Sequence, residues 1–179
     1  MSNESSMVII LCEDSQQEAF LRRFLKKRNI VGKKIRVVKN PAGKGSGEHF
    51  VRKEFPMQLN ALRKRSAKTD LIVAIDADLS EVTQIRQKLE TACSEQQIDR
   101  RAEKERVSFI IPKRNIETWI HYLNGNEVNE QSVYPKLQKE SDCQSAVDYL
   151  YEICSVSKSS AGFPDSLLDA CHEYKKIER

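Results

Sequence analysis

Short apolar runs alternate with longer amphipathic stretches over the first two thirds of the chain. The apolar runs at 7–12, 70–76 and 106–112 have the length of strands and are too short for buried helices, and the more basic stretch at 33–39 also predicts a strand. Apolar residues recur at helical spacing in the stretches that follow them, at 15–28, 50–66, 80–104 and 116–123. The pattern therefore predicts strands and helices in alternation.

This alternation predicts an α/β fold. Successive strands joined by helices form right-handed crossovers, which give a mostly parallel sheet covered by helices on both faces. We therefore expect a Rossmann-like four-stranded unit at residues 7–124. Residues 125–179 are polar and turn-rich at first and then contain amphipathic segments, which predict a small helical C-terminal extension that packs on or beside this unit.

Two features interrupt the second quarter of the chain. The stretch NPAGKGSGEH (40–49) predicts a glycine-rich loop, and Pro56 is expected to break or bend the helix that follows. The loop does not match a nucleotide-hydrolysing P-loop, because Lys44 is followed by Gly45 instead of a hydroxyl residue. Lys44 and the loop amides either approach a nucleic-acid phosphate or belong to an ordinary mobile loop.

Charge is unevenly distributed along the 179 residues. The net charge is only +4, but Lys and Arg are concentrated at 22–39 and 52–68, whereas acidic residues dominate after Asp70. The basic residues of the first half would suit binding along nucleic-acid phosphates. Two solvent-exposed helix faces explain the same charge pattern equally well.

The cysteines and the hydropathy of the chain limit the cellular compartments in which the protein is expected. The five cysteines are widely spaced and include no C-x-x-C pair, which argues against zinc fingers and against a secreted disulfide framework. The N-terminal stretch has no basic region before its short apolar run, and no stretch approaches the ~20 apolar residues of a membrane span. We therefore expect a cytoplasmic protein that does not bind membranes.

Carboxylates follow three of the four predicted strands. Ligands of open parallel sheets bind beyond the carboxyl ends of the strands, so these carboxylates should meet at one edge. Their mutual repulsion would be relieved by a hard divalent cation, and Mg²⁺ or Mn²⁺ are the obvious candidates. The residues are Glu13 and Asp14 after the first strand, Asp76 and Asp78 after the third, and Glu117 after the fourth.

Helix capping offers another explanation for some acidic residues. Ser15 with Glu18, and Asp78 with Glu81, have the spacing of a capping box, and for Glu18 and Glu81 we favour the cap. Asp76 stands too early for such a role. Glu117 and His121 lie four residues apart on one helix face, either as a metal or acid–base pair or as a solvated pair.

The order strand–Glu–helix and then strand–DxD, within a four-stranded α/β unit, resembles the TOPRIM domain of topoisomerases, bacterial primases and OLD-family nucleases. CEDSQQEAFLRRFL (12–25) and IPKRNIETWIHYL (111–123) are similar to segments of small stand-alone TOPRIM proteins of the OLD-like and RloB-like type. The resemblance covers about residues 7–123.

The resemblance implies a metal-dependent nuclease acting on DNA or RNA. It implies that Glu13, Asp76, Asp78 and Glu117 are catalytic residues and metal ligands, with Glu18 as the second acidic residue of the opening motif. One or two Mg²⁺ or Mn²⁺ ions would activate water and stabilise the leaving oxygen.

Further roles follow from the same resemblance. Lys113 or Arg114 would stabilise charge on the phosphate and contact nucleic acid. The predicted nucleic-acid contact of Lys44 rests on its loop and not on this resemblance. The family glycine after the first glutamate is Asp14 here. An ABC-type or SMC-like ATPase would be the partner, in bacterial anti-phage defence, and the C-terminal extension would be a docking surface.

Two alternatives remain open from the sequence. DADLS (76–80) fits the D-x-D-x-[ST] motif of haloacid-dehalogenase-like phosphatases, in which Asp76 would be the nucleophile, although that motif normally opens its fold. The chain is also compatible with a TOPRIM module that binds metal or nucleic acid, or holds a partner, without catalysis.

Overall fold

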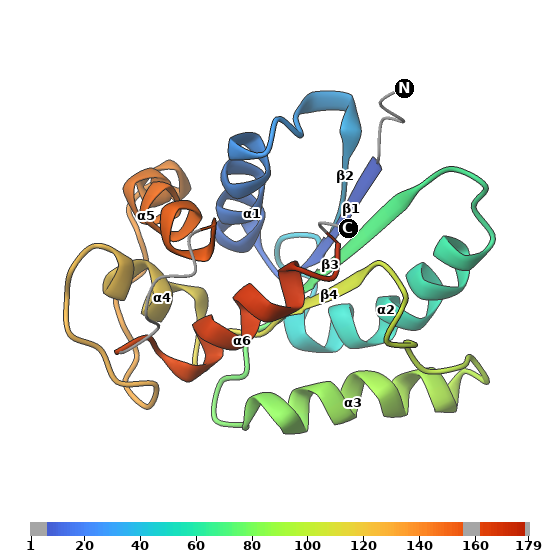
Figure 1. Ribbon diagram of the computed structural model, residues 1–179. Helices are drawn as coiled ribbons and strands as arrows, with labels where there is room; N and C mark the ends of the chain where they lie inside the picture. The colour runs from blue at the N-terminus through green and yellow to red at the C-terminus, as the bar shows by residue number, and fades with distance from the viewer. Residues whose placement is uncertain (1–6, 156–161, 178–179) are drawn as a thin grey trace.

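The computed structural model describes residues 7–155 and 162–177. They form a three-layer arrangement in which helices cover both faces of one parallel sheet (Figure 1). The strands are β1 (Met7–Cys12), β2 (Ile35–Lys39), β3 (Thr69–Ala74) and β4 (Val107–Ile110), in the order β2-β1-β3-β4. Every pair is parallel, so the predicted α/β class with a four-stranded sheet flanked by helices is confirmed.

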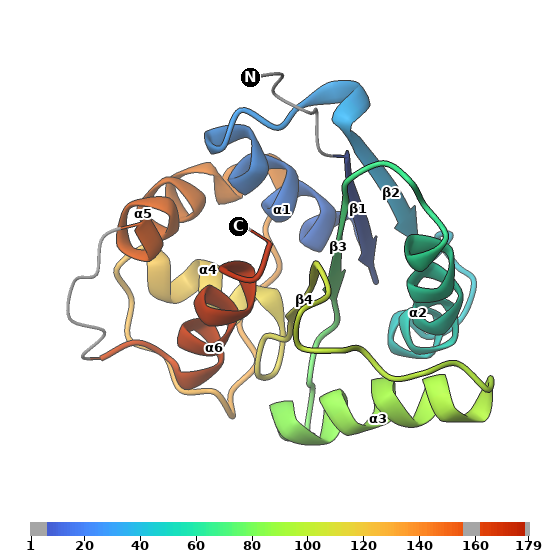
Figure 2. The same ribbon diagram turned by 45° about the vertical axis from the view of Figure 1, so that its right-hand side comes forward.

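The helices fall into two groups, one on each face of the sheet (Figure 2). One face is covered by α2 (Gly47–Arg63) and α3 (Val82–Glu95). The other is covered by α1 (Ser15–Lys27), α4 (Ile116–Leu123), α5 (Gln144–Ser155) and α6 (Asp165–Tyr174). Short 3₁₀ turns, η1 (Gly32–Lys34) and η2 (Glu140–Cys143), precede β2 and α5.

Alternating strand residues supply the two cores. Val8 and Ile10 of β1 face the cluster under α1 and α4, while Ile9 and Leu11 face the cluster under α2 and α3. All are fully buried. Because both faces of β1 and β3 are covered, these strands are continuous apolar runs instead of alternating ones.

The C-terminal extension contributes to the first of these cores. Leu150 of α5 and Leu167 of α6 belong to the same buried cluster as Phe20 and Trp119. Helix α6 also lies along β4, which is an edge strand: Glu173 Oε2 accepts a hydrogen bond of 2.9 Å from the Phe109 N–H. The extension therefore covers a sheet edge that would otherwise be exposed. Positions 156–161 and 178–179 of the predicted extension lie outside the described residues.

Several predicted helix limits are wrong. Helix α3 ends at Glu95, not near 104, because Gln97 takes a left-handed conformation (φ 56°) and the Ile98 N–H returns to the Cys93 carbonyl. Helix α2 begins at Gly47, inside the predicted loop, because Ser46 caps it through the His49 N–H. It continues past Pro56 to Arg63, so Pro56 does not break it.

Two further findings concern the cysteines and hydropathy. Cys154 of α5 and Cys171 of α6 form a disulfide, which the spacing of the cysteines did not predict. Cys12, Cys93 and Cys143 are free and buried. Among the described residues, no helix is both long and apolar enough to cross a membrane.

Candidate active site at the carboxyl edge of the sheet

Glu13 and Asp76 meet where the two central strands end. Residues Leu11 and Val73 are register partners in the neighbouring strands β1 and β3, so the segments that follow these strands run side by side. Glu13 Oε1 accepts a hydrogen bond of 2.6 Å from the backbone N–H of Asp76. The structure thus places two of the predicted site residues in direct contact.

Gln17, in the first turns of α1, connects both residues. Its side-chain oxygen accepts a hydrogen bond of 2.9 Å from the Glu13 N–H, and its Nε2 donates one of 3.0 Å to Asp76 Oδ1. Gln17 is only 1% exposed, so its amide is held firmly in this bridging position. The two acidic residues and Gln17 therefore form one hydrogen-bonded unit.

The environment disfavours the charged forms of both carboxyls. Burial raises the pKa of Glu13 to about 7, and the negative charges of Asp78, Asp14 and Glu48 add to the increase. The hydrogen bond from the Asp76 N–H opposes it by lowering the pKa. Burial also raises the pKa of Asp76 well above its ordinary value, and Glu13 is the charged neighbour that contributes most. Carboxylates held at such a cost are typical of functional sites.

Asp78 lies at the same edge but in a different setting. It is exposed, its backbone is left-handed (φ 48°), and its N–H donates a 2.9 Å hydrogen bond to the carbonyl of Arg114, which is also left-handed (φ 67°). Left-handed conformations are costly for residues other than glycine, Asn and Asp. The two loops after β3 and β4 are therefore fixed to each other at the predicted site.

Lys113 points toward the start of α3. Its Nζ donates hydrogen bonds of 2.8 Å to the Ser80 carbonyl and 2.6 Å to Glu81 Oε1. In this conformation the ammonium group that we expected at the substrate phosphate is paired with Glu81. Its predicted role would require exchange of this partner.

Neither capping box has the residues that the spacing predicted, but the capping role favoured for Glu81 is confirmed, because Glu81 and Gln84 form a capping box at the start of α3. Asp14, not Ser15, caps α1 by accepting a 2.9 Å hydrogen bond from the Gln17 N–H, while Glu18 forms ion pairs with Arg22 and Lys39. Glu81 is itself the N-cap of α3, and its N–H donates to Gln84 Oε1. The N-cap of α1 lies one residue before the predicted Ser15, and the N-cap of α3 lies three residues after the predicted Asp78.

Glu117 is buried in the first turn of α4, with 5% exposure. Burial raises its pKa, and Asp14 contributes while Lys136 opposes the change. Its charge also acts on Asp76, which places it near the same edge. The His121 ring stacks on the Tyr134 ring, with ring centroids 4.8 Å apart.

The glycine-rich loop borders Glu13 from the other side. An open cleft of about 510 Å³ lies between this loop and the start of α1, lined by Glu13, Asp14, Lys39 and residues of the loop. Lys44 is exposed on the loop, whose turn is closed by the hydrogen bond from its N–H to the Pro41 carbonyl. Loop, cleft and carboxyl unit are therefore contiguous.

Gly47 is required by the close approach of this loop to Glu13. A Cβ atom at position 47 would lie 2.7 Å from Glu13 Cβ and 2.8 Å from Glu13 Oε2. Glycine to alanine in a helix normally stabilises by about 1 kcal/mol. Here we expect Gly47→Ala to destabilise by about 1–3 kcal/mol in urea unfolding, because overpacking outweighs helix propensity.

The double variant Glu13→Gly/Gly47→Ala provides the control for this prediction. With the Glu13 side chain removed, alanine at position 47 should no longer destabilise relative to Glu13→Gly alone. A single Gly47→Ala variant as stable as the native chain would contradict the close contact.

Sequence reasoning missed Gln17 and Glu48. Gln17 lies in the first turn of α1, whereas Glu13 precedes the N-cap, so helical spacing does not link the two residues. Glu48 lies in the first turn of α2, inside the predicted loop, and its charge raises the pKa of Glu13. It forms ion pairs with Arg52 and Lys88, at 3.4 Å and 3.7 Å.

The oxygen donors of the carboxyl unit suit a hard divalent cation. Across residues 7–155 and 162–177, no three His, Cys, Asp or Glu side chains converge as a ready metal-ligand set. Mg²⁺, however, is commonly held by one or two carboxylates, with water and substrate phosphate as its other ligands. Glu13 and Asp76 fit that mode of binding.

Comparison with known proteins gives no further assignment. No protein-family model matches the chain. No curated protein and no solved structure matches it. The carboxyl unit of Glu13, Gln17 and Asp76 therefore stands on its own geometry.

Proposed function

We propose that the chain is a nuclease that uses Mg²⁺ or Mn²⁺ to hydrolyse phosphodiester bonds of DNA or RNA. One observation carries the proposal: Glu13 and Asp76 are held together at the carboxyl edge of a parallel sheet. Both have raised pKa values, and the charged neighbours with the largest effects on them are other carboxylates. A divalent cation would offset this repulsion.

The residues have distinct roles in this proposal. Glu13 and Asp76 hold the cation, Gln17 orients both, and Asp78 and Glu117 add negative charge at the same edge. The cation, when bound, activates water and stabilises the leaving oxygen.

In this proposal the substrate lies in the cleft between the glycine-rich loop and α1. Lys44 does not line the cleft but is exposed on the same loop, from which it would reach the substrate phosphates. Lys113 and Arg114 approach from the loop after β4, and Lys113 exchanges Glu81 for a phosphate oxygen. Such positive groups stabilise charge that develops on a transferring phosphoryl group.

The resemblance to stand-alone TOPRIM proteins extends the proposal to its setting. It supports a cytoplasmic effector of anti-phage defence whose activity is restrained by an ABC-type or SMC-like ATPase. Because nuclease activity then depends on the state of this complex, metal binding by the chain alone is the more direct first test.

The first experiment is calorimetric titration with Mn²⁺ of the native chain and of the variants Asp76→Asn and Glu13→Gln. We expect Mn²⁺ to bind the native chain. Both variants should lose this binding, because each substitution removes one charged ligand while the shape of the site is kept. Glu103→Gln, an exposed position in the turn before β4, is the matched control and should bind as the native chain does.

Cleavage of end-labelled DNA and RNA with Mn²⁺ then tests the reaction. If both variants lose Mn²⁺ binding and cleavage together, the chain is a nuclease. If the native chain binds Mn²⁺ but cleaves neither DNA nor RNA, even with the ATPase partner, it is a module without catalytic activity. Mn²⁺ binding that persists in both variants would refute the assignment of the metal site to Glu13 and Asp76.

A further inference from the structure

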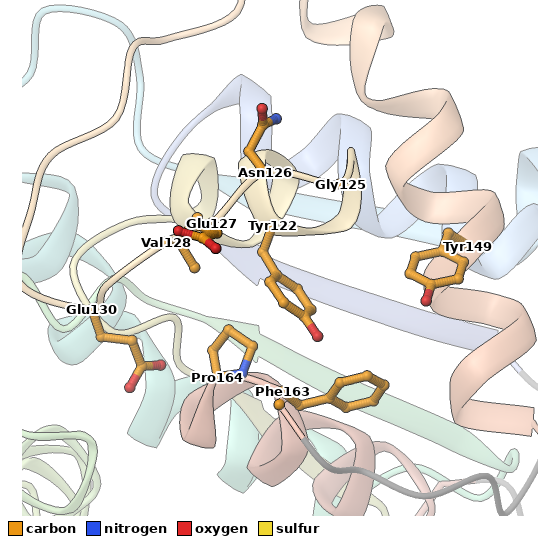
Figure 3. A pocket seen from close by; sticks show the side chains of 10 residues that line it. Tyr122, Gly125, Asn126, Glu127, Val128, Glu130, Tyr149, Phe163 and Pro164 are labelled. Carbon is orange, nitrogen blue, oxygen red and sulfur yellow. The ribbon is translucent and has the colours of Figure 1, made fainter.

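A separate cavity lies beyond the C-terminal end of α4, where that helix meets α5 and the start of α6 (Figure 3). Its volume is about 600 Å³, within the usual range for small-molecule sites. None of the residues of the proposed nuclease site lines it, so it raises a separate question of ligand and role.

Three aromatic rings from three segments border this cavity: Tyr122 of α4, Tyr149 of α5 and Phe163, just before α6. The rings of Tyr122 and Phe163 are 5.9 Å apart in an edge-to-face arrangement. Burial raises the pKa of Tyr122, and Tyr149 adds to the change. In Figure 3 the Tyr122 ring points into the space between Phe163 and Tyr149.

The charged side chains of the wall are acidic, and Asn126 and the two tyrosine hydroxyls are its neutral polar groups. Glu127 and Glu130 both line the cavity. Glu130 is fixed from behind: it accepts hydrogen bonds from the N–H and the hydroxyl of Ser166, and that hydroxyl accepts one of 2.8 Å from Trp119 Nε1. No Lys or Arg is among the described residues that line the cavity.

These features favour a positively charged organic ligand. Aromatic faces carry partial negative charge and attract ammonium and guanidinium groups, and they do so more strongly where water is partly excluded. The two carboxylates add to that attraction, whereas a phosphate or carboxylate ligand would meet only repulsion. A neutral ligand would gain only hydrogen bonds from the acidic wall and no attraction between opposite charges.

We propose that this cavity binds an organic cation of the ammonium or guanidinium type, between the rings of Tyr122, Tyr149 and Phe163 and the carboxylates of Glu127 and Glu130. The cation belongs either to a free small molecule or to an Arg or Lys side chain of another protein. The recognition chemistry is the same in both cases.

The test compares a cation with a neutral molecule of the same shape. The ¹⁵N-labelled chain is titrated with tetramethylammonium and, separately, with tert-butanol, and amide shifts are followed by NMR. Tetramethylammonium should shift the amides of the lining residues in a saturable way, and tert-butanol should not. Equal shifts with both compounds, or none with either, would overturn the proposal.

Variants at exposed positions localise the binding. Tyr149 is 46% exposed, so Tyr149→Leu should fold normally while it removes an aromatic face, and Glu127→Gln removes one charge from an exposed side chain. Each should weaken tetramethylammonium binding by about 2- to 30-fold. Val133→Ala, at a 66% exposed position outside the cavity, is the control and should leave the affinity unchanged.

Two guanidinium compounds then distinguish the source of the cation. Tighter binding of a capped Gly-Arg-Gly peptide than of agmatine supports a protein side chain, and the reverse supports a free small molecule. Unchanged affinity in both Tyr149→Leu and Glu127→Gln would contradict the cavity as the site.

Discussion

Replacement of Glu173 by glutamine is expected to lower the free energy of unfolding by about 3 kcal/mol at pH 7. Glu173 is 3% exposed and joins α6 to β4 through the Phe109 N–H. It also pairs with Arg101 at 2.5 Å, Arg86 at 2.9 Å and Lys176 at 2.6 Å. Glutamine keeps the shape and an acceptor, but three cations lose their common counter-charge.

The effect should depend on pH in a defined direction. Burial alone opposes ionisation of Glu173, but the hydrogen bonds from Arg101, Lys176 and the Phe109 N–H outweigh it and lower the pKa to about 2. A depressed pKa stabilises the fold above the unfolded value of about 4.5 and ceases to do so as the pH falls toward 2. The native chain and the variant should therefore converge in stability near pH 2.

Urea unfolding between pH 2 and pH 8 measures both statements. Asp169→Asn is the matched control: Asp169 also pairs with Arg86, but its side chain is 38% exposed, so its loss should cost at most about 1 kcal/mol. If Glu173→Gln is no more destabilising than Asp169→Asn at pH 7, the buried network does not hold the extension to the sheet.

The sheet could be predicted from the sequence because its central strands are buried on both faces. Such strands appear as continuous apolar runs, and β1 was predicted with the limits that the structure has. The runs at 70–76 and 106–112 were predicted slightly too long, since β3 ends at Ala74 and β4 at Ile110. Beyond those ends the chain still contains apolar residues, but it no longer pairs with the neighbouring strands and instead forms the loops of the site.

Side-chain partners were less predictable than strands. Acidic residues after strands indicated where Glu13 and Asp76 would lie, because parallel strands end at one edge. Whether an acidic residue caps a helix depends on where the helix begins, and a shift of one residue transfers the cap from Ser15 to Asp14. The contact of Glu173 with Phe109 joins residues 64 apart in sequence, so no local sequence pattern predicts it.

Glu173 and Glu13 have the same carboxyl group but opposite effects on stability. Glu173 is ionised against three cations, so its charge stabilises the fold. Glu13 is buried among other carboxylates, so its charge costs stability. Residues retained at such a cost are expected where function requires them.

The second large effect is therefore an increase in stability. With its pKa raised to about 7, Glu13 favours folding in its protonated form, and this contribution is lost as the pH rises from about 4.5 through 7. Glu13→Gln has no charge to bury and keeps an oxygen acceptor for the Asp76 N–H. Without metal, we expect it to be more stable than the native chain by up to about 3 kcal/mol at pH 8, and by less than about 1 kcal/mol at pH 5.

Guanidinium unfolding at pH 5 and pH 8, in the presence of a chelator, measures this difference, with Glu103→Gln as the control that should change neither value. Addition of Mn²⁺ at pH 8 should stabilise the native chain and leave Glu13→Gln unaffected, because only the native site gains a ligand that binds the folded state. A Glu13→Gln variant that is less stable than the native chain at pH 8 would mean that this carboxylate is already neutralised by the protein, and a cation would then not be needed at the edge of the sheet.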